Sequence, residues 1–119
     1  MYENCDIFIQ VSKKEGLGLG FYEAISNGIP VLTLNTPPHN EIIQEGINGW
    51  TVSCKYEKMF DNPESLIDDA VVDIELLSEK MLEIINIEDL SEIKRNTFED
   101  YKSRFSFKNF KNIIIKNLE

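Results

Sequence analysis

Two glutamates, Glu15 and Glu23, stand on either side of a glycine-rich turn in the segment EGLGLGFYE. A carboxylate accepts hydrogen bonds from hydroxyl groups and can hold two adjacent hydroxyls at once. Glycines that lead into the start of a helix expose backbone N–H groups, which bind anions with the helix dipole behind them. The segment therefore suits a ligand with an anionic middle and hydroxyl-bearing ends, as a sugar nucleotide has. A purely structural turn is the alternative, because tight turns need glycine for positive φ.

The better-known phosphate-binding motifs do not fit this turn. The glycines of GLGLG miss the G-x-G-x-x-G spacing of dinucleotide-binding folds, and the strand that follows ends at Asn35 rather than at an acid that would hold a ribose. A P-loop ends in Gly-Lys followed by Ser or Thr, whereas this turn ends in Gly20-Phe21-Tyr22. Both the dinucleotide and the P-loop interpretations are therefore disfavoured.

The segments around the turn predict a strand, a helix and a second strand. Residues 5–12 (CDIFIQVS) are apolar with almost no polar alternation, as in a strand covered on both faces. From Leu19 the pattern is helical, and the helix should stop at Asn27-Gly28 before Pro30. Residues 30–35 (PVLTLN) complete a βαβ unit whose strands should be parallel and whose crossover should be right-handed. The helix stripe expected to face the core is Phe21, Ala24, Ile25 and Gly28.

Residues 36–55 continue this pattern with a short helix around residues 40–44 and a third strand at residues 49–54 (GWTVSC). The sequence thus predicts an α/β fold with a small parallel sheet of about three strands flanked by helices. We expect residues 1–119 to form a single partial domain. Its βαβ core should occupy residues 1–55, and residues 56–119 should be mainly helical.

The helical part of the chain is expected to hold three segments. The first helix would be capped by Asn62, with Pro63 at its first position and a break near Asp73 left open. The second would begin at Ser91. The last, from about residue 106, is amphipathic and should pack its apolar stripe against the sheet. That stripe is Phe107, Phe110, Ile114 and Leu118.

The segment EGLGLGFYE, continuing into AISNGIPVL, resembles the donor site of retaining GT-B glycosyltransferases of the glycosyltransferase family 4 type, which carry an E-x7-E motif. The likeness extends to CDIFIQVSKKEG before the motif and to TPPHNEIIQEGINGWTV after it. A shorter match, FSFKNF, lies at the start of the closing helix. The resemblance covers essentially residues 1–60 and is looser beyond them.

This resemblance implies a role for each matching residue. Glu23 would hold the ribose hydroxyls, and Glu15 would contact the transferred sugar near the reacting carbon. Glu15 is therefore the candidate catalytic residue, although not as a nucleophile. The donor-binding set is Glu15, Gly16, Leu17, Gly18, Leu19 and Glu23. No metal or other cofactor is expected, because enzymes of this kind generally work without one.

The resemblance also implies what this sequence lacks relative to the family. A full GT-B enzyme has two Rossmann-like domains, and these residues match only the second half of the donor-binding domain. The Arg and Lys that usually pair with the diphosphate belong to the half that is not matched. In the family the strand at residues 5–11 would be central, so its edge at Ile7–Val11 should be open to a second copy or a partner chain. A non-catalytic module that binds a nucleotide or a protein is the alternative function.

Composition bounds the remaining possibilities. The net charge of −9 argues against general nucleic-acid binding, which depends on neutralising phosphates. The two cysteines, Cys5 and Cys54, form no zinc motif and should be free, buried thiols. Apolar runs are far shorter than the roughly 20 residues of a membrane span, and the start MYENCDIF resembles no signal peptide. We therefore expect a cytoplasmic protein. His39, the sole histidine, is expected to be structural or exposed.

Overall fold

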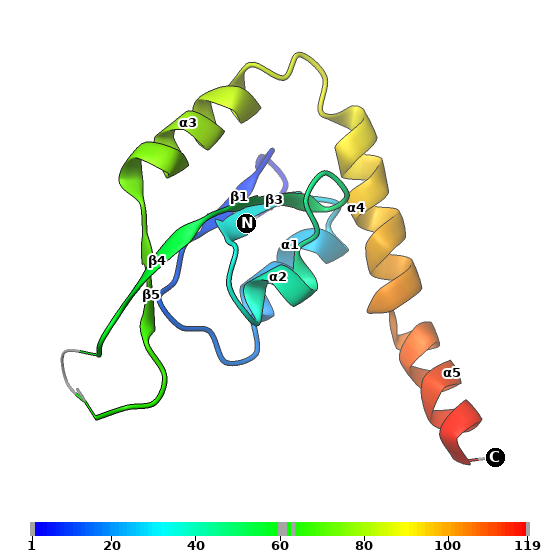
Figure 1. Cartoon of the computed structure of the whole chain (residues 1–119). Helices are drawn as coiled ribbons and strands as arrows, with labels where there is room; N and C mark the ends of the chain where they lie inside the picture. The colour runs from blue at the N-terminus through cyan, green and yellow to red at the C-terminus, as the bar shows by residue number, and fades with distance from the viewer. Residues whose placement is uncertain (1, 60–61, 63, 119) are drawn as a thin grey trace.

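The computed structural model describes residues 2–59, 62 and 64–118. Its centre is a parallel sheet in the order β1 (Phe8–Gln10), β2 (Val31–Leu34) and β3 (Gly49–Val52) (Figure 1). Helix α1 (Leu19–Ser26) connects β1 to β2, and the short helix α2 (His39–Ile42) connects β2 to β3. The predicted βαβ unit, the third strand and the α/β fold class are confirmed.

The sheet is covered on both faces because the side chains of β2 alternate between two apolar clusters. Val31 packs with α1 and α2, in a cluster with Phe21, Ala24, Ile25, Ile29, Ile42 and Ile43. Leu32 points to the opposite face and packs with Trp50, Val52 and Ile84 of α3 (Ile74–Ile85). All four residues of β2 are buried, as the run of apolar side chains predicts for a central strand. The result is an arrangement of three layers, with helices on both faces of the sheet.

The segment predicted to be a helix from Asn62 forms a strand instead. Strand β5 (Asp69–Val72) pairs antiparallel with β4 (Cys54–Glu57), and Ala70 lies opposite Tyr56. The helix begins only after Asp73, whose carboxylate accepts the N–H groups of Glu75 and Leu76 at 3.1 and 3.3 Å. The possible break near Asp73 is therefore the true start of the helix. Pro63, the predicted first helical residue, lies outside the described residues.

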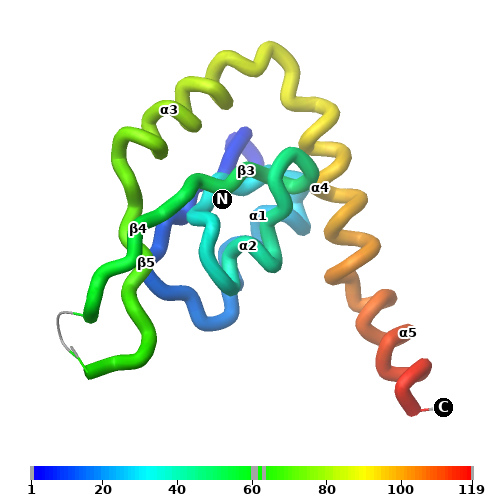
Figure 2. Tube along the Cα trace, viewed as in Figure 1, coloured from blue at the N-terminus to red at the C-terminus, as the bar shows by residue number. Residues whose placement is uncertain are grey.

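The last two helices extend from the side of the sheet domain. Helix α4 (Ser91–Arg104) packs beside α1, and α5 (Phe107–Leu118) continues from its end away from the sheet (Figures 1 and 2). The prediction that α5 packs on the sheet is wrong, because none of its described residues is buried. The side chains of its predicted apolar stripe are largely exposed to solvent. Their exposed fractions are 77% for Phe107, 56% for Phe110, 42% for Ile114 and 82% for Leu118.

Strand β1 lies at one end of the sheet order, so one of its edges has no strand beside it among the described residues. Ile9 in this strand is 45% exposed. The open apolar edge that the sequence implied is present. Association of a second copy or a partner chain through Ile7–Val11 stays a prediction.

Candidate functional site

The glycine-rich turn joins the carboxyl end of β1 to the N-terminus of α1, and Gly18 fixes its shape. Gly18 adopts φ +68° and accepts the N–H of Phe21 at 3.0 Å, so it closes the first turn of the helix. A Cβ atom at this position would lie 2.9 Å from side-chain atoms of both Ile42 and Phe21. The left-handed backbone and the close packing each require glycine here.

Glu15 is held against this helix start by two hydrogen bonds. Its Oε1 accepts the backbone N–H of Gly18 at 3.1 Å, and its Oε2 accepts the side-chain amide of Gln10 at 2.5 Å. The N–H of Gly18, expected from the resemblance to bind the donor, is therefore engaged by Glu15 in this structure. The backbone N–H groups of Leu17 and Leu19 have no partner among the described residues, so they are open to an anion.

A cavity of about 590 Å³ opens beside Glu15 at the carboxyl ends of β1 and β2. Ligands of open α/β sheets bind at this edge, because the loops that follow parallel strands converge there. The hairpin of β4 and β5 supplies the opposite wall. The lining residues are Lys13, Lys14, Glu15, Thr36, Pro37, Tyr56, Leu66, Ile67, Asp68 and Ala70.

Glu23 lies in a different place. It is exposed on α1, and its Oε2 accepts the hydroxyl of Tyr2 at 3.2 Å. Partial burial and then this hydrogen bond raise the pKa of Tyr2 above its usual 10.0. The structure does not bring Glu15 and Glu23 to one cavity.

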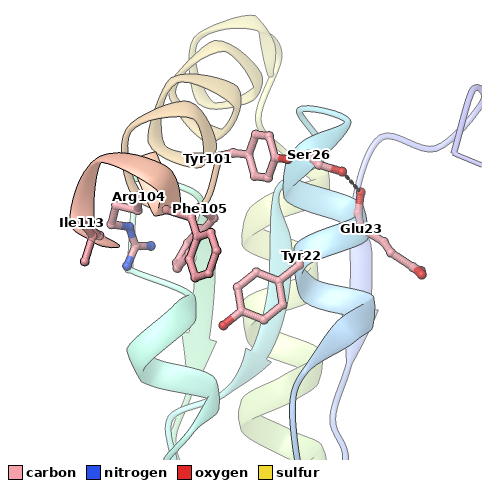
Figure 3. A pocket seen from close by; sticks show the side chains of 8 residues that line it. Tyr22, Glu23, Ser26, Tyr101, Arg104, Phe105 and Ile113 are labelled. Atoms are coloured by element: carbon pink, nitrogen blue, oxygen red, sulfur yellow. Dashed lines mark hydrogen bonds between the residues drawn. The ribbon is translucent and has the colours of Figure 1, made fainter. Parts of the chain in front are cut away.

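The cavity beside Glu23 measures about 530 Å³ and lies between α1, α4 and α5 (Figure 3). It is largely apolar, and its wall includes an edge-to-face pair of Tyr22 and Phe105 with ring centroids 5.0 Å apart. The carboxylate of Glu23 points away from this pair, while Tyr22 points toward Phe105 (Figure 3). Glu23 therefore reaches solvent at the rim of the cavity rather than its apolar interior.

His39 is 1% exposed and occupies the interior between α1 and β2. Thr33 has one hydroxyl proton, which it donates to the backbone carbonyl of Gln10 at 2.7 Å. Nδ1 of His39, 3.3 Å from the same hydroxyl oxygen, must therefore carry a proton and donate it. Nε2 has no partner among the described residues, so the neutral ring is favoured. Burial lowers the pKa of His39 below 6.5, and the smaller effect of the Glu15 charge opposes this shift.

This shift predicts an acid-sensitive contribution to stability. The unfolded chain binds a proton on His39 near pH 6.5, whereas the folded protein does so only at lower pH, so stability falls as the pH drops below 6.5. The slope from this one group is at most about 1.4 kcal/mol per pH unit. Urea unfolding of the protein and a His39→Gln variant between pH 7.5 and 5 measures it. Equal pH dependence in the two proteins would contradict the assignment.

The described residues contain no group of three or more His, Cys, Asp or Glu side chains arranged to hold a metal ion. Among the same residues, no helix is both long enough and apolar enough to cross a bilayer. Cys5 and Cys54 are free thiols, as predicted, but both are half-buried rather than buried. The main candidate site is the Glu15 carboxylate, which is fixed at the N-terminus of α1 beside the cavity.

A family model described as glycosyl transferases group 1 matches residues 1–81, which is more than half of the chain. The chain belongs to this family. The matched region runs from β1 through most of α3 and includes both the turn with Glu15 and the cavity beside it.

Two curated relatives of this chain carry the description UDP-N-acetylglucosamine–peptide N-acetylglucosaminyltransferase GtfA subunit. The one from Streptococcus agalactiae is 30% identical over 67 residues, which cover 56% of this chain and 13% of that protein. The one from Streptococcus pneumoniae is 29% identical over 62 residues, which cover 51% of this chain and 12% of that protein. No solved structure matches the chain. The matched segment is therefore a small part of the length of both relatives.

Two residues around Glu15 were not foreseen from the sequence. Gln10 holds Glu15, and Thr33 binds the backbone of Gln10. The signal for Gln10 was available, because it is the one polar side chain inside the otherwise apolar run IFIQV. Thr33 gave no comparable signal, since threonine is common in strands.

Proposed function

We propose that this chain is part of the donor-binding domain of a glycosyltransferase of the family 4 type. It would bind a nucleoside diphosphate sugar for transfer to an acceptor with retention of configuration. The observation that carries the proposal is the fixed carboxylate of Glu15 at the N-terminus of α1, beside the cavity at the carboxyl edge of the sheet. Membership of the glycosyl transferases group 1 family supports it.

The roles of the site residues follow from this arrangement. Each oxygen of Glu15 accepts one protein hydrogen bond, which leaves a second lone pair on each for hydroxyls of the transferred sugar. The open N–H groups of Leu17 and Leu19 would stabilise the diphosphate as it departs, because they are already oriented before the reaction begins. Glu23 would hold the ribose hydroxyls at the other end of the donor. The proposal assigns no metal or other cofactor.

The donor that deserves the first trial is UDP-N-acetylglucosamine, which appears in the names of both curated relatives. The acceptor, the rest of the active site and the whole protein's activity would involve regions that the matched segment does not include. A cytoplasmic location is part of the proposal, and the two free thiols fit a reducing compartment.

The proposal predicts how two substitutions change binding. We expect Glu15→Gln to weaken binding of the nucleotide sugar about 10- to 100-fold, because hydrogen bonds to a charged acceptor are lost. Binding of the nucleoside diphosphate alone should change less than about twofold, since Glu15 contacts the sugar. Glu23→Gln should weaken both ligands, because both contain the ribose. Calorimetry or NMR titration with UDP-, GDP- and ADP-sugars and the corresponding diphosphates measures these effects.

Glu41→Gln is the matched control, because Glu41 is an exposed glutamate on α2 outside the cavity. It should leave every affinity unchanged. A protein that binds none of the three nucleotide sugars would favour the non-catalytic module instead. The separate positions of Glu15 and Glu23 are the specific observation in favour of that second candidate.

A further inference from the structure

We propose that Gln10 is a positioning residue, whose side-chain amide sets the orientation of the Glu15 carboxylate toward the donor sugar. Gln10 is the last residue of β1, and its Nε2 donates to Glu15 Oε2 at 2.5 Å and to Ser12 Oγ at 3.1 Å. The function given to Glu15 rests on the proposed donor site. The contact between Gln10 and Glu15 does not, because it exists without a ligand.

Gln10 can serve as an anchor because its own position is fixed by the sheet. It lies opposite Thr33 in the parallel pairing of β1 with β2, and its carbonyl accepts the Thr33 hydroxyl at 2.7 Å. Thr33 is fully buried and accepts the Nδ1 proton of His39 in turn. A chain of hydrogen bonds thus runs from His39 in the core to the backbone at Gln10.

The side chain of Gln10 is half-buried and lies close to α1. It passes over the start of α1, where a Cβ atom added at Gly20 would lie 2.8 Å from Gln10 Oε1. Glycine at position 20 therefore leaves the space that the amide of Gln10 occupies. The alternative role of this glycine, to expose backbone N–H groups to an anion, does not account for that close approach.

The two hydrogen-bond donors around Glu15 determine which side-chain group fits at position 15. Gln10 Nε2 and the N–H of Gly18 both donate, so both side-chain oxygens at position 15 must accept. A carboxylate meets this requirement, whereas an amide would turn its NH₂ group toward one of these donors unless the amide of Gln10 also reversed to accept through Oε1. Without the amide of Gln10, only the N–H of Gly18 would restrain the carboxylate, which could then rotate about that single contact.

The test uses three variants of the 119-residue chain. Gln10→Met keeps the length and removes the donor. The exchange variant, Gln10→Glu with Glu15→Gln, lets the amide at position 15 donate to the carboxylate at position 10 and still accept the N–H of Gly18. Gln44→Met is the control, because Gln44 is exposed and lies outside the cavity. Each is studied by NMR without ligand and by titration with UDP-N-acetylglucosamine and UDP.

Without ligand, we expect the Gly18 amide to exchange its proton about tenfold faster in Gln10→Met and to lose its wild-type chemical shift. The exchange variant should return both toward wild type, and Gln44→Met should change neither. With ligand, Gln10→Met should weaken UDP-N-acetylglucosamine binding about tenfold and leave UDP binding unchanged. The exchange variant should not recover sugar binding, because its charge has moved to position 10.

An unchanged Gly18 amide in Gln10→Met would overturn the inference, as would equal weakening of UDP and UDP-N-acetylglucosamine binding. If the wild-type chain binds no nucleotide sugar, the proposed donor site fails for this chain. The Gly18 amide then still decides whether Gln10 orients Glu15.

Discussion

A Gly49→Ala variant is expected to lose its folded state, because the new methyl group has no space between β2 and β3. A Cβ atom at Gly49 would lie 1.9 Å from the carbonyl oxygen of Val31 and 2.8 Å from its backbone N and C. These are backbone atoms of the paired strand, since Val31 lies opposite Gly49 in the sheet. No side-chain rotation can relieve such a contact. The strands would have to separate, which would expose Leu32 and Trp50 of the core.

The expected loss exceeds about 4 kcal/mol, which approaches the whole stability of a small domain at about 5–15 kcal/mol. Urea unfolding followed by circular dichroism measures it. Gly46→Ala is the matched control, because Gly46 has φ +75° but no atom lies within 4 Å of its added Cβ. The free energy of unfolding of that variant should fall by only about 1–2 kcal/mol, the cost of placing alanine in the left-handed region. Similar unfolding midpoints for the two variants would show that the sheet accommodates the methyl group.

Removal of the Arg104 side chain is expected to cost about 2–4 kcal/mol. Its guanidinium binds both oxygens of Asp100, at 2.7 and 2.8 Å, and the carbonyls of Glu41 and Ile42 at the end of α2. The Asp100 side chain is only 9% exposed, so Arg104→Met would leave a buried charge with Asn48 as its other partner. The guanidinium is 27% exposed, which places the cost below the 3–5 kcal/mol of a fully buried pair.

Thermal and urea unfolding of three variants tests this explanation. Lys102→Ala, on the same helix, breaks an exposed pair with Glu99 and should cost no more than about 1 kcal/mol. Arg104→Met combined with Asp100→Asn should be more stable than Arg104→Met alone, because no charge is then left buried. If the double variant were the less stable of the two, the buried charge would not be the source of the cost.

The βαβ core could be predicted because its signals are local. The apolar run before the turn, the helical stripe of Phe21, Ala24 and Ile25, and the stop at Gly28 each lie within a few residues of one another. The buried stripe also fixes the outward side of α1. Glu23 lies off that stripe and therefore points to solvent. This explains why Glu23 does not line the cavity beside Glu15.

The strand β5 could not be predicted in the same way. Ala70 fits a helical spacing with Leu66 and Leu77, but residues 69–72 became a strand because β4 lies beside them with open hydrogen-bonding groups. That partner is 12 or more residues away in the sequence, so no local pattern records the pairing. The stripe on α5 failed for a related reason: its spacing shows that one face is apolar, but not which surface covers that face.

The sequence alone determined the fold class and membership of the glycosyl transferases group 1 family, because residue types and short-range spacing carry those features. The tertiary structure decided where the functional groups lie relative to one another. It placed Gln10 on Glu15, committed the N–H of Gly18 to that carboxylate, and separated Glu15 from Glu23. These outcomes depend on how α1 and β1 pack against β2, and that packing is set by contacts between residues far apart in the chain.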